Sequence, residues 1–585
     1  MGKVIEPIED FGEDLVNTGE RVFKKIKRSF RSLFNQQGGG GDDQLSVYVG
    51  GAAYGNGGND TLKAYALYAK LHGGSGDDRF YAYSGRAEIY GDSGNDKIDA
   101  WGGSNKIRGG SGNDSVWARG SHNDIDGGSG NDYIRTWGGF ATVKGGRGKD
   151  NIAVNGRRNE VRGGSDNDNL RAWGGQNTIK GDSGNDDIAA SEGSNKIYGG
   201  DGNDKLKVTG DHNHVAGDAD NDTIDVEGNH NTALGGDGND TIDVRGTSNT
   251  IRGNDGQDKI QVYGGFNNID GGSDNDDIRV WGSNNVIKGG SGHDDIAVFA
   301  GYNEILGGSG NDNIETWGDF NFVFGDAGHD NIKIRGNRNT VLSGDGDDHV
   351  IVEGYRNTIK TGNGNDQVIA LGQWNTITAD GQSGDYTLLV SQGMHNTFEG
   401  GVGQNFFIGG GLGNTFQGGS GQNTFLLGAT NNFIGGASED LYIFDEWNSG
   451  TAADFFAVDG WDAQNLLGNS DLQSGTVRID NQGNDATLDK LLFGGGADET
   501  QLRFSQTGND LIIDVLDTGS QLLLQNWYSS VVDRIDEIQI SNGATLSKQR
   551  VDSLVNAWTQ YEAGAIDNAG LESAIANAWE TSPSV

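Results

Sequence analysis

The chain has 585 residues, including 103 glycines, two prolines and no cysteine, and its formal net charge at pH 7 is −41. Disulfide bonds therefore contribute nothing to its stability, and because no long apolar run occurs we expect no transmembrane helix. We also expect no nucleic-acid partner for so acidic a chain.

Residues 1–37 precede a long repeat and include a basic amphipathic segment at 20–34. Val22, Ile26, Phe30 and Leu33 fall on one face of a helix, and basic residues cover the rest. Two interpretations stay open: the helix caps the end of the repeat region, or its basic face contacts an anionic membrane or cell-surface polysaccharide. The first thirty residues contain no apolar core of signal-peptide length, so we expect no cleaved signal peptide.

Residues 38–385 form a repeat with a period of eighteen residues. Eighteen aspartates recur at this spacing, and each ends a turn related to Gly-Gly-x-Gly-x-Asp, such as GGSGND at 109–114. A period this strict indicates one supersecondary unit stacked on copies of itself. A shorter first coil ends at Asp43 and adds a nineteenth candidate. The candidate metal ligands are Asp43, Asp60, Asp78, Asp96, Asp114, Asp132, Asp150, Asp168, Asp186, Asp204, Asp222, Asp240, Asp258, Asp276, Asp294, Asp312, Asp330, Asp348 and Asp366.

The repeat also fixes the predicted strands. Counted from the first glycine, position eight is apolar in every copy, position ten is small or β-branched, and position seventeen is apolar. Positions eight and ten lie on the same face of an extended strand. Each repeat therefore contains two short strands joined by two turns, with a thin apolar seam that only stacking buries. The predicted fold is all-β: a right-handed parallel β-roll, or β-solenoid, of about 18–19 coils with 18 residues per coil.

The two turns of each coil differ in charge. At the second turn the residue equivalent to the aspartate is asparagine, from Asn105 to Asn375, with alanine at 69, 87 and 141. A neutral amide is a poor lone ligand for calcium, but stacked amides can hydrogen-bond along a column. The sequence thus predicts a metal column at the first turn and an asparagine ladder at the second.

The composition of the first turn selects the metal. Carboxylates stacked about 5 Å apart would repel one another strongly if nothing lay between them. The turn offers carboxylate and carbonyl oxygens without cysteine or an ordered pair of histidines, and this donor set favours Ca²⁺ over Zn²⁺. We expect a single column with about one Ca²⁺ per coil. The alternative is that the aspartates form Asx-turns without metal.

These motifs resemble the RTX, or haemolysin-type calcium-binding, proteins. Their nonapeptide GGxGxDxUx is matched by GGSGNDSVW at 109–117 and GGDGNDTID at 235–243. The resemblance covers residues 38–385 and implies that each aspartate lies between two ions, with glycine-turn carbonyls completing the shell. The chain departs from the family pattern because alternate nonapeptides lack the aspartate; in this it is similar to the one-sided calcium solenoids of some bacterial adhesin and ice-binding regions. The resemblance also implies export by type I secretion machinery.

The repeat weakens towards the C-terminus. The register is predicted to slip by one residue near Asp380. Residues 386–444 are predicted to be metal-free coils, with Asn405, Asn414 and Asn423 in place of the ligand and phenylalanines that enlarge the core. Residues 445–548 are predicted to form a small β-rich domain, whose second half resembles the module that precedes RTX export signals. Residues 549–585 are expected to be a helical C-terminal secretion signal.

Position eleven carries aromatic residues that we expect on an outer face of the roll. Two interpretations stay open: the rings stack on one another and stabilise the sheet, or they form a partner surface for sugar rings or for another copy of the chain. The residues are Tyr65, Tyr83, Trp101, Trp137, Trp173, Tyr263, Trp281, Phe299 and Trp317.

No catalytic motif accompanies the repeat. The sequence contains no Gly-x-Ser-x-Gly, His-Glu-x-x-His or P-loop pattern, and its nine histidines share no column that would build a site, so we expect no enzyme. We expect a secreted calcium-binding structural protein of the bacterial cell surface or extracellular matrix (S-layer, sheath or fibril), similar to oscillin-type fibrillar surface proteins. Its expected partners are copies of itself and, in the alternative, cell-surface polysaccharide or lipopolysaccharide. That alternative is a calcium-dependent adhesin that binds polysaccharide or ice.

Overall fold

The computed structural model describes residues 35–48, 50–83, 85–427, 431–444, 476–480, 489–494, 497–516, 519–529 and 535–580. The chain divides into two compact units, residues 1–263 and 264–585, and each is described by itself. The fold is all-β, a parallel β-solenoid of about 22 turns with about 18 residues per turn, and this confirms the predicted fold class. The hand of the winding stays a prediction.

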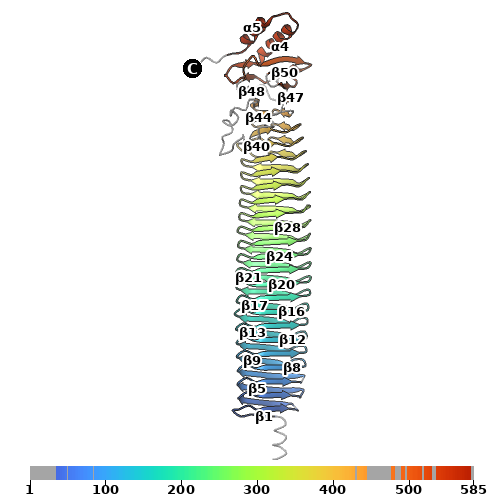
Figure 1. Cartoon of the computed structure of the whole chain (residues 1–585), viewed down its shortest axis with the longest axis vertical. Helices are drawn as coiled ribbons and strands as arrows, with labels where there is room; N and C mark the ends of the chain where they lie inside the picture. Colours follow the sequence, from blue (N-terminus) through green and yellow to red (C-terminus); the bar gives the residue numbers. More distant parts are fainter. Residues whose placement is uncertain are drawn as a thin grey trace, which may run out of the picture. The chain divides into compact units, whose positions relative to one another are not determined.

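In the first unit, consecutive strands alternate between two parallel sheets, so that each coil contributes one strand to each sheet (Figure 1). The odd-numbered sheet contains β1 (Asn35–Gln37), β3 (Gly51–Gly57), β5 (Tyr68–Ser75), β7 (Arg86–Ser93), β9 (Lys106–Ser111), β11 (Asp124–Ser129), β13 (Thr142–Arg147), β15 (Glu160–Ser165), β17 (Thr178–Ser183), β19 (Lys196–Asp201), β21 (His214–Ala219), β23 (Thr232–Asp237) and β25 (Thr250–Asp255). The even-numbered sheet contains β2 (Gln44–Val47), β4 (Thr61–Ala64), β6 (Arg79–Ala82), β8 (Lys97–Trp101), β10 (Ser115–Arg119), β12 (Tyr133–Trp137), β14 (Asn151–Asn155), β16 (Asn169–Trp173), β18 (Asp187–Ser191), β20 (Lys205–Thr209), β22 (Thr223–Glu227), β24 (Thr241–Arg245) and β26 (Lys259–Tyr263).

The second unit begins with the same alternation. Its odd-numbered strands are β27 (Asn268–Ser273), β29 (Val286–Ser291), β31 (Glu304–Ser309), β33 (Phe322–Ala327), β35 (Thr340–Asp345), β37 (Thr358–Asn363), β39 (Thr376–Thr378), β41 (Thr397–Glu399), β43 (Thr415–Gln417), β45 (Asn432–Ile434) and β47 (Thr476–Asp480). Its even-numbered strands are β28 (Asp277–Trp281), β30 (Asp295–Val298), β32 (Asn313–Thr316), β34 (Asn331–Ile334), β36 (His349–Val352), β38 (Gln367–Ala370), β40 (Tyr386–Ser391), β42 (Gln404–Gly409), β44 (Asn423–Leu427), β46 (Asp440–Phe444) and β48 (Lys490–Phe493).

The second unit ends in antiparallel strands and two helices. The last elements are β49 (Leu502–Thr507), β50 (Asp510–Val515), β51 (Ser520–Leu524), β52 (Glu537–Gln539), β53 (Thr545–Ser547), α4 (Lys548–Glu562) and α5 (Asn568–Ala578). The pairs β49–β50, β50–β51 and β52–β53 are antiparallel. The two helices agree with the predicted helical tail, but its role as a secretion signal stays a prediction.

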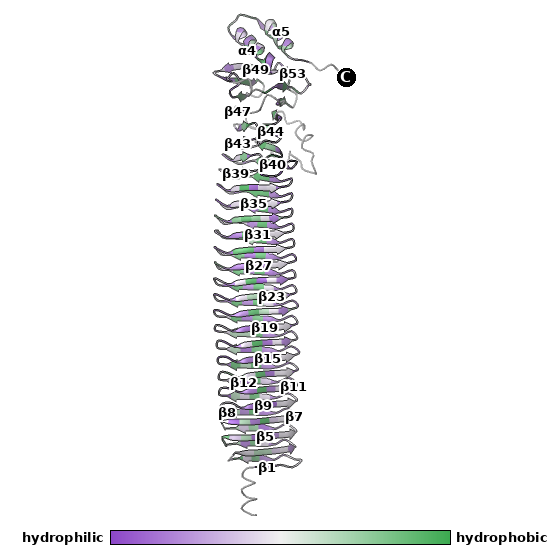
Figure 2. Ribbon diagram, turned by 180° about the vertical axis from the view of Figure 1, so that it is seen from behind, coloured by the Kyte–Doolittle hydropathy of each residue, from purple (hydrophilic) through white to green (hydrophobic). Residues whose placement is uncertain are grey.

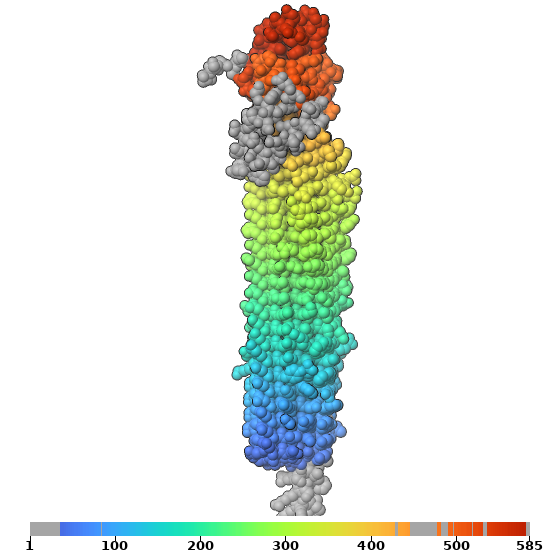
Figure 3. Space-filling view, in the orientation of Figure 1, coloured from blue at the N-terminus to red at the C-terminus, as the bar shows by residue number. Residues whose placement is uncertain are grey.

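The apolar seam is where the repeat predicts it. In β20 and β22, Leu206 lies opposite Ile224 and Val208 opposite Val226, and none of the four is exposed. Figure 2 shows this as hydrophobic centres on otherwise polar strands, and Figure 3 shows the coils of the first unit as tightly packed layers. Because each coil contributes only a few apolar side chains, burial depends on the neighbouring coils above and below.

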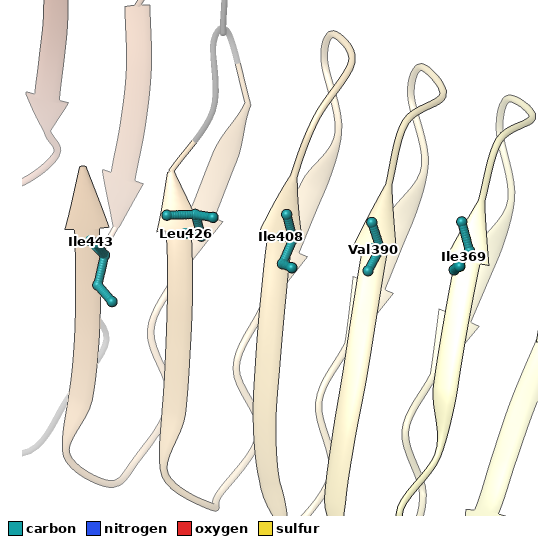
Figure 4. Packing of buried hydrophobic residues seen from close by; sticks show 5 residues of the cluster. All are labelled: Ile369, Val390, Ile408, Leu426 and Ile443. Carbon is teal, nitrogen blue, oxygen red and sulfur yellow. The ribbon is translucent and has the colours of Figure 1, made fainter. Parts of the chain in front are cut away.

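The C-terminal coils of the second unit are held by aromatic stacking. Phe398, Phe416 and Phe433 stack along the odd-numbered strands at centroid distances of 4.8 and 4.9 Å. Phe407 and Phe425 stack along the even-numbered strands at 4.8 Å and meet the first column edge to face. A further apolar column on these strands is buried as well, and Figure 4 shows its five members, Ile369, Val390, Ile408, Leu426 and Ile443. The expectation that phenylalanines enlarge the core here is confirmed.

Two details differ from the sequence predictions. Gln367 pairs with Leu388 and Thr376 with Thr397, so this coil has 21 residues and the register shifts by three, not by one. The extra residues lie in the first turn, where an insertion leaves both sheets paired. In addition, β47 pairs with β45 and β48 with β46 in parallel, so these strands of the region 445–548 extend the sheets of the coils. The predicted domain boundaries stay predictions.

The amphipathic segment 20–34 lies outside the described residues. Among those that are described, no helix is long and apolar enough to cross a membrane.

Candidate metal column at the first turn

The predicted aspartates form buried columns within each unit. Asp204 is 2% exposed; its Oδ1 accepts a hydrogen bond from the backbone N–H of Asp186, and its own N–H donates to Oδ1 of Asp222, both at 2.7 Å. The same bond recurs along the first unit from Asp43 to Asp240. In the second unit it runs from Asp276 to Asp366. One oxygen of each carboxylate is thereby fixed by the fold.

The second carboxylate oxygen lies in a different environment. Among the described residues, Oδ2 of the aspartates from Asp60 to Asp240 is buried without a hydrogen-bond partner. It faces the carbonyl oxygen of the first glycine in the next coil: a Cβ built on Gly199 would lie under 3.0 Å from both Oδ2 of Asp204 and the carbonyl oxygen of Gly217. Two acceptors therefore converge with no donor between them. This arrangement is costly unless a cation or a proton lies there.

The oxygen atoms that converge have the chemistry that calcium requires. Carboxylate and backbone carbonyl oxygens are hard ligands, and a glycine at the first position leaves the space beside them open. No group of three His, Cys, Asp or Glu side chains gathers anywhere in the described part of the chain. An ion in this column would therefore be held by the carboxylate of a coil together with turn carbonyls, as the resemblance to RTX proteins implies.

Glycine and its substitutes supply the turn geometry. Asn56 and Asp92 replace the second glycine of their turns and adopt left-handed backbone, both with φ 73°. Asn and Asp tolerate this conformation better than other side chains do. The turn shape is therefore preserved in coils that lack the second glycine.

Burial changes the acidity of the column. It raises the pKa of each aspartate from Asp78 to Asp240 to between about 6 and about 8; the backbone hydrogen bond acts in the opposite direction, and neighbouring acidic side chains raise the values further. In the second unit burial raises the pKa of Asp312 to about 6 and that of Asp330 to about 7. Without a bound cation the fold thus favours protonated carboxyl groups.

The asparagine column is the neutral counterpart. The N–H of Asn213 donates to Oδ1 of Asn231 at 2.7 Å, as in the aspartate column. The amide nitrogen of Asn213 then donates to the carbonyl oxygen of Gly210 at 3.0 Å. The predicted asparagine ladder is confirmed: the backbone N–H donates along the column, and some side-chain amides, such as that of Asn105 to Oδ1 of Asn123, do so as well. Because its second side-chain atom is a donor, this column needs no ion.

The first candidate ligand differs from the others. The N–H of Asp43 donates to Oδ1 of Asp60, so Asp43 belongs to the column. Its Oδ2, however, accepts from the N–H of Gly39 at 2.6 Å, and its side chain is only half-buried. Asp43 is therefore a terminal member of the column whose Oδ2 already has a protein donor.

At the C-terminal end of the column, the predictions for Asn405 and Asn423 are confirmed, but the prediction for Asn414 is wrong. Asn414 belongs to the asparagine ladder: its Oδ1 accepts from the N–H of Asn396 at 2.8 Å, and its own N–H donates to Oδ1 of Asn431 at 2.9 Å.

Ser343 and Thr361 occupy the first position of the coils of Asp348 and Asp366, where the other coils have glycine. Because of the 21-residue coil, Thr387 follows Asp366 in register, and Asn405 follows Thr387. Asn423 then donates from its amide to Oδ1 of Asp440 at 2.8 Å.

The column continues across a long stretch of sequence. The N–H of Asp440 donates to Oδ1 of Asp489 at 2.9 Å, and Oδ2 of Asp440 accepts from the N–H of Gly436 at 2.6 Å. Asp489 lies 49 residues after Asp440, so no periodic spacing could have identified it.

The aromatic residues at position eleven are exposed or half-buried, and several of them stack on a neighbouring ring. Tyr65 stacks on Tyr83 at 5.4 Å, and Phe299 stacks on Trp317 at 4.5 Å. Arg119 lies 4.0 Å from the ring centroid of Trp101 and 5.4 Å from that of Trp137, so its guanidinium joins two rings that are two coils apart. Stacking is thus present, and a partner on this surface stays a prediction.

Comparison with known protein families agrees with this geometry. The RTX calcium-binding nonapeptide repeat matches residues 72–107, 102–134, 144–179, 180–207, 262–296, 299–332 and 339–383. The haemolysin-type calcium binding protein related domain matches residues 510–550, and a protein family of unknown function (DUF3060) matches residues 208–265. A comparison with curated proteins finds no match. The chain is therefore an RTX repeat protein, with calcium-binding nonapeptide repeats that fold as a parallel β-solenoid.

Proposed function

We propose that this protein is a secreted calcium-binding structural protein of the bacterial cell surface or extracellular matrix. It folds when calcium binds outside the cell and then assembles with copies of itself. The observation that carries the proposal is the run of buried Oδ2 atoms, from Asp60 to Asp240, that face carbonyl oxygens without a donor. RTX repeats bind calcium, and proteins that contain them are typically exported by type I systems.

The residues that would hold calcium follow from the geometry of the coil. In the first unit, Oδ2 of each aspartate from Asp60 to Asp240 and the carbonyl oxygen of the first residue in the next coil converge on one space. A bound Ca²⁺ supplies positive charge between stacked carboxylates. The chain positions these oxygens through the Oδ1 hydrogen bonds and keeps other side chains out through glycine. Since extracellular calcium sites bind at about 10⁻⁴–10⁻³ M, the column would be empty in the cytosol and filled outside.

The structural role rests on the same repeats. An RTX β-solenoid is a calcium-binding scaffold and typically not an enzyme. Aromatic and arginine side chains stack on the outside of the coils, and such rigid surfaces suit contacts between copies.

Electron microscopy of the purified full-length chain tests the proposal. With millimolar calcium we expect filaments or lattices, and with magnesium at the same concentration we expect none. Monodisperse particles under both conditions would contradict the structural role. If the chain folds with calcium but does not assemble, the proposed calcium binding stands and the second candidate function is favoured.

That second candidate is an adhesin for acidic polysaccharide, and one surface of the second unit favours it. An open hollow of about 720 Å³ is lined by Arg338, Tyr355, Arg356 and Trp374 among others. Tyr355 and Trp374 are 47% and 56% exposed, and such rings can stack on sugars. Among the described residues neither Arg338 nor Arg356 forms a salt bridge, whereas the nearby Arg335 pairs with Glu315 and Glu353.

Glycan binding separates the two functions. In a glycan array we expect uronate-containing polysaccharides to bind if the adhesin proposal holds, and Arg338→Ala with Arg356→Ala to abolish that binding. Arg158→Ala is a matched control, because Arg158 occupies the same turn position in the first unit and hydrogen-bonds to Gln176. An array without any bound glycan would exclude the adhesin.

A further inference from the structure

The last two aspartate coils differ from the others at the position that leaves space for an ion. Ser343 and Thr361 replace the first glycine, and both side chains are fully buried. The hydroxyl of Ser343 donates to the carbonyl oxygen of Thr361 at 2.6 Å. This carbonyl is the equivalent of the one that faces Oδ2 in the glycine coils.

The glycine coil just before them shows what the hydroxyl replaces. A Cβ on Gly325 would lie under 3.0 Å from both Oδ2 of Asp330 and the carbonyl oxygen of Ser343. In the next coil a real Cβ stands at that place, and its hydroxyl donates to the carbonyl oxygen of Thr361. The hydroxyl of Thr361 is buried without a hydrogen-bond partner among the described residues, so in its coil the side chain only fills the space. A hydroxyl donor and a cation serve the same acceptor, but they cannot share the same space.

The coils that follow need no cation at this edge. Thr387 and then Asn405 continue the column in register. The amide nitrogen of Asn405 donates to the carbonyl oxygen of Gly403 at 3.1 Å and to Oδ1 of Asn423 at 3.0 Å. The first turn position therefore changes at Ser343. The carboxylate position changes after Asp366, where Thr387 and then Asn405 replace the aspartate.

We propose that the side chains of Ser343 and Thr361, which fill the space that glycine leaves in the other coils, end the calcium column, so that Asp348 and Asp366 hold no calcium ion of their own even though Oδ2 of both carboxylates has no hydrogen-bond partner. This inference rests on the proposed calcium binding. The two hydroxyl residues join the ion-dependent coils to coils that are stable without metal. The second unit thereby keeps a folded end on which the calcium-dependent coils can be added when calcium appears.

The number of calcium ions per chain tests the inference. Equilibrium dialysis of the full-length protein against radioactive calcium would compare wild type with the double variant Ser343→Gly and Thr361→Gly. We expect about two additional ions in the variant, one for each reopened turn. Ser343→Ala is the matched control: it removes the hydroxyl but keeps the Cβ, and the ion count should not rise. Gly199→Ser is the reverse change and should lower the count, since it places a hydroxymethyl group in the middle of the column.

The outcomes separate the two claims. An unchanged count in the double glycine variant would overturn the inference while leaving calcium binding intact. A lower count in Ser343→Ala would also overturn it, because the hydroxyl would then be a calcium ligand. A wild-type chain that binds no calcium would instead overturn the proposed function.

Discussion

At the scale of single residues, aspartate and asparagine occupy equivalent positions at the two turns. Both accept a backbone hydrogen bond through Oδ1, as Asp204 does from Asp186 and Asn231 does from Asn213. They differ in the second atom, which is an oxygen without a donor in Asp204 and an amide donor in Asn213. The two edges of a coil therefore differ by a single atom in each side chain, which lacks a donor at the aspartate edge and is itself a donor at the asparagine edge.

Exchanging these residues gives the first prediction. Asp204→Asn removes a carboxylate from the column, so calcium binding by the central coils should weaken and the calcium midpoint of folding should rise. Asn213→Asp replaces a donor by an acceptor that faces the carbonyl oxygen of Gly210, which should lower stability by about 1–3 kcal/mol at any calcium concentration. Circular dichroism during calcium and urea titrations checks both. Equal effects of the two changes would contradict the assignment of the edges.

The pH dependence of the metal-free protein gives the second prediction. Burial raises the folded-state pKa of Asp114 and Asp168 to about 8 and that of Asp78 to about 6, whereas an unfolded aspartate has a pKa of about 3.9. A raised carboxyl pKa means that the folded state binds more protons than the unfolded state. The stability that protonation provides is thus complete below about pH 4 and is lost as the pH rises through about 6 to 8.

Thermal melting of desalted, calcium-free protein at several pH values measures this effect. We expect the melting temperature to fall between pH 4 and pH 8, and calcium to restore it at pH 8. A melting temperature of the metal-free chain that rises over this range would contradict the protonated column.

At the scale of elements, the aspartate coils and the phenylalanine coils are stabilised differently. The former bury small apolar residues such as Val208 and Val226 beside a column of carboxylates. The latter bury Phe398, Phe416 and Phe433 in one stack beside neutral amides. Larger apolar area can replace the contribution of a metal ion, so these coils should stay folded when calcium is absent.

The third prediction concerns this stack. Phe416→Ala should cost about 3–5 kcal/mol, because it leaves a cavity between two buried rings. Urea unfolding in the presence of a chelator, followed by fluorescence, measures the loss. Leu412→Ala is the control, since Leu412 is 44% exposed and its loss should change little. Equal unfolding midpoints for both variants would show that the phenylalanine stack does not hold these coils.

The elements could be predicted best from the sequence where the period is strict. The positions of the seam, of Asp60 to Asp366 and of the asparagine ladder follow from it, because every coil must pair with identical neighbours. The 21-residue coil and the entry of β47 into the sheet next to β45 did not follow, since insertions in turns leave no trace in the strand pattern. Asp489 was missed because it lies 49 residues after Asp440, the residue that donates to it, outside any period. The contact of Arg119 with Trp101 and Trp137 could have been predicted, since Arg119 lies one period from each ring.

At the scale of the whole molecule, charge and folding are coupled. The formal net charge is −41, and the buried aspartates of the first turn contribute much of it. Each calcium ion offsets two negative charges, so a filled column would remove most of the repulsion between coils. Because each coil is buried only by its neighbours, binding and folding should proceed together along the chain.

The fourth prediction follows from this coupling, and it tests the central claim most directly. Far-ultraviolet circular dichroism of the full-length chain should show little β structure in a chelator at pH 8 and a cooperative gain on addition of millimolar calcium, with no such gain on addition of magnesium. If the chelator leaves both the spectrum and the melting temperature unchanged, the aspartate column does not depend on calcium and the account is wrong.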